Sequence, residues 1–502
     1  MKVSQKDFAI GLACLFSFLP TLFAPIMHVD EGVFISLSDY AQTGELYSKF
    51  TDLKPPLLFL LYHWLSLGLQ GLWAFHVFQI LGLCLAAWSL KRFLSYWISE
   101  EAAFMAAFIF ALCSGRIDYG SGMPERVLMP FILVASYLSV LILQSTKLNT
   151  KYILAIGVGL LVGAASLIKQ PGGLLGVGAL CCLLMDRFRW RLVILSGAGV
   201  LISHILVFGL IGTSPELIWK EAYTINFGTY MHVQMDHRLQ WMDRLVNLLG
   251  NYGIEIPALI LGGLYGFKES VAFVCLKRQQ LLKFLEGRFI LLSLILICFS
   301  ALAISLGGRF YSNYHIMSFF GLACLMALGL EFSEHRKPIF IVLLSLAIIS
   351  NLVFHSLTFY RLATDQFKDW DSEVQALNDK ILKLSDSSDS LWINHGFGYL
   401  YHSTRRRPAV KFMHFMHNLQ YVDVCLLGDG QISGLRQNPN YEQSIRELKE
   451  NKPKLIFWAS RHKNSCTDRL KLEIFPEIQN LLESSYEKIS EQSLGSLYRR
   501  RF

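Results

Sequence analysis

The stretch from residue 28 to residue 60, HVDEGVFISLSDYAQTGELYSKFTDLKPPLLFL, interrupts an otherwise apolar N-terminal part of the chain. It follows an apolar run at 8–27 and precedes another at 72–90. A membrane crossing needs about 20 mostly apolar residues, so both flanking runs are candidate spans. Within the stretch, apolar residues from Val33 to Ala41 recur at near-helical spacing, which predicts an amphipathic helix on the membrane surface. We call residues 28–55 the first loop.

The composition also indicates a membrane protein. The 502 residues are 53% hydrophobic and 17% charged, with a mean hydropathy of +0.40. Soluble chains are about one-quarter charged, so a soluble enzyme, a disordered chain and a fibrous protein are excluded. Asp, Glu, Lys and Arg number 45 in residues 1–359 and 39 in residues 360–502. We therefore predict a membrane domain at 1–359 and a soluble domain at 360–502.

The apolar runs predict a mostly α, polytopic helical bundle with about 11 to 13 spans. If the N-terminus is cytoplasmic, the cytoplasmic loops hold 16 basic residues and the outer loops hold 9, as the positive-inside rule requires. If 56–71 does not make a full crossing, the other 11 runs place the first loop and the tail outside. The first run lacks a clear cleavage site and predicts an uncleaved span. The runs are 8–27, 56–71, 72–90, 101–115, 125–144, 152–168, 171–185, 191–212, 250–267, 289–306, 314–330 and 338–359.

The tail predicts a small extracytoplasmic α/β domain, because strand-like runs alternate with helical stretches. These runs are Leu391–Asn394, Leu455–Ala459 and Ser496–Arg501. The basic run Arg405-Arg406-Arg407 is interpreted as a solvated edge, with contact to anionic lipid as the alternative. Cys425 and Cys466 are the cysteines of this polar tail, and a disulfide between them stays open.

The first loop begins with Asp30-Glu31 and ends with Lys54. A carboxylate can act as a general base, and a lysine can neutralise a phosphate. The alternative for the acidic pair is a helix cap with a solvated neighbour. Several basic residues on the predicted outer side lie at span ends, where a cation often meets an anion; contact with lipid headgroups is the alternative. They include Lys54, Arg126, Lys169 and Arg309.

The order of these features resembles the GT-C glycosyltransferases, in particular the protein O-mannosyltransferase and lipid A aminoarabinose transferase branch. An Asp-Glu pair follows the first span, and Lys54-Pro-Pro-Leu-Leu58 closes the first loop. The outer stretch 116–126 (RIDYGSGMPER), the turn 169–172 (KQPG) and the stretch 308–315 (GRFYSNYH) support the resemblance. Many relatives carry an acidic residue just before the Lys-Pro, where this chain has Leu53, with Asp52 one place earlier.

The resemblance implies an inverting transfer of a sugar from a polyprenyl-phosphate lipid to a lipid, glycan or protein acceptor. The turn 169–172 and the tail resemble those of bacterial members of the family. This resemblance favours a bacterial inner membrane, with the reaction at the extracytoplasmic face. Asp30 is the expected general base with Glu31 in support, and Lys54, Lys169 and Arg309 are expected to bind the donor phosphate. Supporting positions are Glu125, Arg126, Tyr311, Tyr314 and His315.

These positions also have structural alternatives: Lys169 ends a span, Glu125 and Arg126 form a local ion pair, and Arg309 and His315 anchor the interface beside Tyr311 and Tyr314. We expect no metal, no cofactor and no nucleic-acid partner. Rival functions for the whole chain are a transporter or flippase of polyprenyl-linked glycans, and a polymerase or ligase of such glycans. The charged first loop favours the transferase, because transporters place their charged sites near the midplane.

The loop charges predict that the tail is extracytoplasmic. A cysteine introduced at an exposed tail position should react with an impermeant thiol reagent in intact spheroplasts. Labelling that requires permeabilisation would reverse the topology and place the first loop on the cytoplasmic side.

Overall fold

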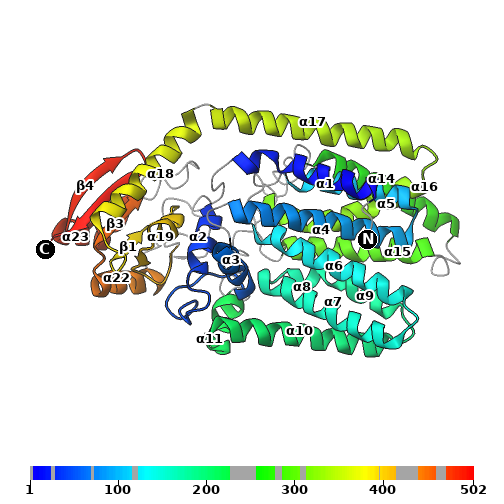
Figure 1. The fold of residues 1–502 in the computed structure, drawn as a ribbon, viewed down its shortest axis with the longest axis horizontal. Coiled ribbons are helices and arrows are strands. Elements are labelled where there is room, and N and C mark those ends of the chain that lie inside the picture. The colour runs from blue at the N-terminus through cyan, green and yellow to red at the C-terminus, as the bar shows by residue number, and fades with distance from the viewer. Residues whose placement is uncertain are drawn as a thin grey trace. The chain divides into compact units, whose positions relative to one another are not determined.

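A computed structural model describes residues 4–23, 29–68, 73–115, 123–225, 256–277, 285–305, 312–363, 365–394, 396–413, 439–459 and 471–501. These residues are mostly helical, with one five-stranded sheet near the C-terminus (Figure 1). The chain divides into two compact units. The helical unit comprises 1–27, 68–207 and 237–360, and the mixed unit comprises 28–67, 208–236 and 361–502. A polytopic helical fold with a small sheet is thus confirmed.

Every apolar run predicted from the sequence contains helix. Among the described residues, eight helices are long and apolar enough to cross a membrane, and Pro56–Leu67 and Gly172–Leu184 are shorter apolar segments. The total of 11 to 13 crossings stays a prediction. The helices are α1 (Gln5–Ser17), α3 (Pro56–Gly68), α4 (Trp73–Trp97), α5 (Glu100–Ser114), α6 (Pro124–Gln144), α7 (Leu148–Ile168), α8 (Gly172–Leu175), α9 (Val177–Leu184), α10 (Arg189–Ile211), α14 (Pro257–Lys277), α15 (Leu285–Ser305), α16 (Phe319–Phe332) and α17 (Arg336–Ala363), with 3-10 turns η1 (Leu19–Phe23) and η6 (Ser312–Ser318).

Glycines let neighbouring helices of the helical unit approach closely. A Cβ at Gly159 on α7 would lie 1.9 Å from the Ser196 carbonyl oxygen on α10. A Cβ at Gly266 on α14 would lie 1.7 Å from the Leu325 carbonyl oxygen on α16. In a bilayer, association depends on packing and not on the hydrophobic effect, so such contacts fix the helix pairs.

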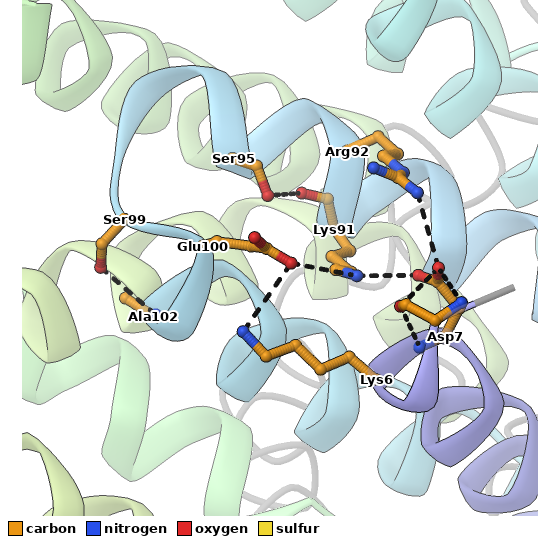
Figure 2. A network of polar contacts seen from close by, with 9 residues as sticks. Lys6, Asp7, Lys91, Arg92, Ser95, Ser99, Glu100 and Ala102 are labelled. Atoms are coloured by element: carbon orange, nitrogen blue, oxygen red, sulfur yellow. Dashed lines mark hydrogen bonds and ion pairs between the residues drawn. The ribbon is translucent and has the colours of Figure 1, made fainter. Parts of the chain in front are cut away.

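A buried ion pair fastens α1 to α4 (Figure 2). Lys91 is 1% exposed, and its Nζ lies 2.8 Å from Asp7 Oδ1. Arg92 approaches the other carboxylate oxygen of Asp7 at 3.5 Å. Glu100, in the first turn of α5, lies 3.7 Å from both Lys6 and Lys91. The contacts join the ends of three helices through opposite charges.

The mixed unit combines the first loop, the segment after α10 and the tail. Its sheet has the order β2-β1-β3-β5-β4, with β1 parallel to β2 and β3, and with β5 antiparallel to β3 and β4. The predicted strand runs correspond to β1, β3 and β5. The elements, besides α3, are α2 (Val29–Ser38), α11 (Pro215–Trp219), the π-helical turn η3 (Lys220–Thr224), α18 (Asp365–Leu384), β1 (Ser390–Ile393), α19 (Tyr399–Thr404), β2 (Arg407–Pro408), α22 (Pro439–Asn451), β3 (Leu455–Ala459), η10 (Leu472–Ile474), α23 (Pro476–Ser485), β4 (Tyr486–Gln492) and β5 (Gly495–Arg500).

Aromatic and aliphatic side chains from strands and helices form the core of the tail. Trp392 on β1 and Trp458 on β3 lie beside Phe475, and all three are buried. Leu448 on α22 and Leu482 on α23 complete the same cluster. The helices thus cover the sheet, as the alternating pattern predicts.

The helix expected on the membrane surface is present, but it is buried on all sides. Every residue of α2 from Val33 to Ser38 is buried. Tyr399 of α19 lies against Gly32, and the Ser36 hydroxyl donates to the Gly398 carbonyl at 2.6 Å. Phe59 of α3 makes an edge contact with Phe34 at a centroid distance of 6.2 Å. Tail and α3 together cover the apolar face that the sequence pattern assigned to lipid.

The basic run of the tail is not a uniform solvated edge. Arg406 is buried, and its guanidinium donates to Ser385 and to the Thr404 carbonyl. Arg407 pairs with Glu45 of the first loop at 2.6 Å. Arg405 takes a left-handed conformation (φ +53°) that ends α19. Two of the three arginines therefore have structural partners within the mixed unit.

Candidate active site

The acidic pair expected to be catalytic lies in the first turn of α2. Asp30 is half-buried and Glu31 is buried. The N-terminal turn of a helix presents unbonded N–H groups and a partial positive charge, which stabilise carboxylates. Phe34 lies four residues beyond Asp30, so the two residues occupy the same face of α2.

Lys54 ends the first loop beside that same aromatic ring. Its Nζ lies 5.7 Å from the centroid of Phe34 and 3.9 Å from Asp52 Oδ1. The backbone N–H of Lys54 also donates to Asp52 Oδ1 at 3.0 Å. The Lys54 side chain is 24% exposed. Asp52 therefore contacts both the backbone and the side chain of Lys54. Asp30 lies one turn of α2 before Phe34, the ring that Lys54 contacts.

Tyr47 fixes the backbone at Lys54. Its hydroxyl donates to the Lys54 carbonyl at 2.6 Å. Burial, together with the nearby Tyr223, Asp52 and Glu221, raises the pKa of Tyr47 well above its ordinary value, so the hydroxyl stays a donor. The Tyr47 backbone has a positive φ of 66°, and its N–H donates to the Phe50 carbonyl at 2.6 Å. A tight turn therefore supports the lysine.

A second group of predicted residues lies in the helical unit. Glu125, in the first turn of α6, accepts a hydrogen bond from the Nζ of Lys169, which directly follows α7. Their side chains are 0% and 8% exposed. The Lys169 ammonium also lies over the ring of Tyr314 on η6, 3.6 Å from its centroid. This ion pair joins the start of α6 to the end of α7.

Arg126 contacts Phe18 and Gln79 in the same unit. Its guanidinium lies over the ring of Phe18, 5.1 Å from the centroid, and an Nη1 hydrogen bond reaches Gln79 Oε1 at 3.4 Å. His315, next to Tyr314 on η6, is buried. The structure thus gathers Lys169, Glu125 and Tyr314 by direct contact. Arg309, Tyr311 and the stretch 116–122 lie outside the described residues.

Sequence reasoning missed two charged residues of the mixed unit, Glu221 and Lys411. Glu221 on η3 accepts from Thr51 of the first loop and from Lys411 of the tail. The partners are 170 and 190 residues apart, so no local pattern indicates them. Across the described ranges, no cluster of three or more His, Cys, Asp or Glu side chains is arranged to hold a metal ion.

Comparisons with known proteins find similarities in sequence and in fold. Residues 54–219, from Lys54 to Trp219, match the family model of dolichyl-phosphate-mannose-protein mannosyltransferases. The fold matches ArnT from Cupriavidus metallidurans bound to undecaprenyl phosphate, with a TM-score of 0.59 and 12% identity over 98% of this chain and 97% of that one. The chain thus resembles known membrane proteins in sequence over residues 54–219 and in fold over nearly its whole length.

Archaeal oligosaccharyltransferase structures have a similar fold. The apo oligosaccharyltransferase of Archaeoglobus fulgidus gives a TM-score of 0.58 at 13% identity, over 99% of this chain and 74% of that one. AglB from the same organism, in complex with an inhibitory peptide and a dolichol-phosphate, gives a TM-score of 0.55 at 12% identity, over 99% of this chain and 74% of that one. The search of curated proteins gave no match to this chain. At these identities, the structural matches establish the fold, and the site residues rest on the geometry above.

The buried pair in the helical unit makes a prediction about stability. Removing one partner leaves the other charge buried, which costs about 3–5 kcal/mol, whereas removing both avoids that penalty. Glu125→Gln and Lys169→Met should each lower the midpoint of thermal unfolding in detergent, and the double variant should recover part of the loss. Lys147→Met, at an exposed position, is the control. Single variants as stable as Lys147→Met would contradict the structural importance of the pair.

Proposed function

We propose that the chain transfers a sugar from a polyprenyl-phosphate donor to a hydroxyl of a lipid, glycan or protein acceptor at the extracytoplasmic face of a bacterial inner membrane. The GT-C fold and the family match over 54–219 support a glycosyltransferase. The ArnT structure holds undecaprenyl phosphate, and the AglB structure holds a dolichol-phosphate. Both lipids are of the class that carries the sugar in the proposed donor.

The observation that carries the proposal is the arrangement of Asp30, Phe34 and Lys54 in the mixed unit. One helix face presents the half-buried carboxylate and, a turn later, the aromatic ring beside the lysine. The acid–base group therefore lies on α2, and the cation lies at the end of the first loop. A glycosyl transfer from a phosphate needs these two groups: one accepts a proton, and the other stabilises the negative charge of the leaving group.

The reaction then proceeds as one displacement at the anomeric carbon. Asp30 removes the proton from the acceptor hydroxyl as its oxygen forms a bond to the anomeric carbon. The bond from that carbon to the phosphate oxygen breaks, and the electron pair leaves with the polyprenyl phosphate. Lys54 stabilises the charge that develops there. Attack opposite the leaving phosphate inverts the configuration of the sugar, and Glu31 is proposed to support Asp30.

The expected roles of Lys169 and Arg309 at the donor phosphate stay predictions. The Lys169 ammonium is already bonded to Glu125 and lies over Tyr314. A phosphate would have to share this cation with a carboxylate. Lys54 is the stronger candidate, because its side chain is 24% exposed whereas that of Lys169 is 8% exposed.

Asp30→Asn tests the proposed general base. The substitution keeps the shape of the side chain and removes the base, so turnover should fall by about 10²–10⁴-fold. The measurement is transfer of label from a radiolabelled polyprenyl-phosphate sugar to membrane lipid, glycan or protein, which requires no transport across a sealed vesicle. Binding of undecaprenyl phosphate should change little.

The matched control is Asp39→Asn, the same substitution just beyond the C-terminal end of α2. Asp39 is exposed and pairs with His402 of the tail at 2.9 Å. Turnover by the Asp39→Asn variant should stay near that of the parent chain. Near-normal turnover of a stably inserted Asp30→Asn variant would show that Asp30 is not the base. Movement of the labelled lipid across vesicles without transfer would favour the flippase instead.

A further inference from the structure

The tail contacts the first loop at Thr51, three residues before Lys54. The backbone N–H of Thr51 donates to the carbonyl oxygen of Lys411, which follows β2, at 3.1 Å. The Thr51 hydroxyl donates to Glu221 Oε2 at 3.2 Å. The Nζ of Lys411 lies 2.8 Å from Glu221 Oε1. Both main chain and side chain of Thr51 are therefore held by segments outside the loop.

These contacts are shielded from water. Thr51 is 5% exposed and Glu221 is 6% exposed, and the Lys411 side chain is 16% exposed. The backbone N–H of Lys411 donates to Glu447 on α22 at 2.7 Å, which ties this segment to the body of the tail. Hydrogen bonds that involve charged, poorly hydrated groups are stronger than neutral, exposed ones. Thr51, Glu221 and Lys411 therefore join three segments of the mixed unit through strong hydrogen bonds, and we call these contacts the junction.

The junction limits the freedom of Lys54. At one end of the segment 51–54, Thr51 is bonded to Lys411 and Glu221. At the other end, the N–H of Lys54 is bonded to Asp52 and its carbonyl to Tyr47. A four-residue segment fixed at both ends has few alternative backbone conformations. The position of the Lys54 side chain on Phe34 depends on that backbone.

Glu221 itself lies on a π-helical turn, η3. Such turns are rare and occur frequently at functional sites, where they re-aim side chains. Here both carboxylate oxygens point to different partners, one to the first loop and one to the tail. Replacing a buried ion pair with apolar residues often preserves stability, so stability alone does not require charges at this position.

We infer that Glu221 and Lys411 are positioning residues, which hold Lys54 in place for the donor phosphate. The inference rests on the proposed role of Lys54 and gives the tail a part in donor binding. If it is right, loss of either charge weakens phosphate binding through Lys54, although neither residue is assigned a contact with the donor.

The test measures the affinity of purified full-length variants for undecaprenyl phosphate in detergent. Lys411→Met and Glu221→Gln should each raise Kd by about 10-fold, within the range of coupling between residues in one network. Lys411→Arg, which keeps the charge, should restore most of the affinity. The matched control is Lys454→Met, because Lys454 also pairs at 2.8 Å but with Asp389 inside the tail. Its Kd should equal that of the parent.

A double-mutant cycle separates positioning from a general structural effect. In a Lys54→Met background, Lys411→Met and Glu221→Gln should cause no further loss of affinity, because the side chain that they position is gone. Further loss of affinity in the Lys54→Met background would overturn the inference. So would single Lys411→Met and Glu221→Gln variants whose Kd equals that of Lys454→Met. Either result would leave the role of Lys54 intact. Unchanged binding by Lys54→Met itself would instead overturn the proposed phosphate contact, and the inference with it.

Discussion

Buried charges in the helical unit are paired across helices, and this pairing constrains how the helices fit together. Lys91 meets Asp7, Lys169 meets Glu125, and Lys151 meets Asp186. Each pair joins an end of one helix to a different segment. A single charge left in a poorly hydrated interior costs several kcal/mol, so a shift that separates any of these pairs is strongly opposed.

The same constraint distinguishes the candidate cations. Lys169 has a buried carboxylate as a direct partner and an aromatic ring on its other side, so its charge is already compensated. Lys54 has an aromatic ring and a carboxylate oxygen 3.9 Å away. The Lys54 side chain is also more exposed than that of Lys169, at 24% against 8%. Two cations that both stand at a span end in the sequence therefore lie in different electrostatic surroundings.

Hydrophobic periodicity predicts the fold well, because it is a local property of the chain. The apolar runs became helices, and the predicted strand Leu455–Ala459 is β3. Strand β4 was not predicted, because its residues YEKISEQ are mostly polar and half-exposed at the edge of the sheet. Asp30 and Lys54 could be singled out from the sequence because one loop carries both. The partner of Lys169 and the roles of Glu221 and Lys411 escaped prediction, because ion pairs between distant segments depend on the tertiary fold.

The first loop owes its shape to contacts from elsewhere in the mixed unit. Between α2 and α3 it contains turns but, apart from one isolated bridge, no regular pairing of its own. The Thr213 hydroxyl donates to the Leu46 carbonyl at 2.7 Å, and Arg407 of the tail pairs with Glu45. Catalytic groups must be held within about 0.5 Å of the productive geometry, which a loop with only turns does not achieve alone. A tail without chemistry-bearing motifs can therefore be essential to the site, because it supplies the rigidity that the loop lacks.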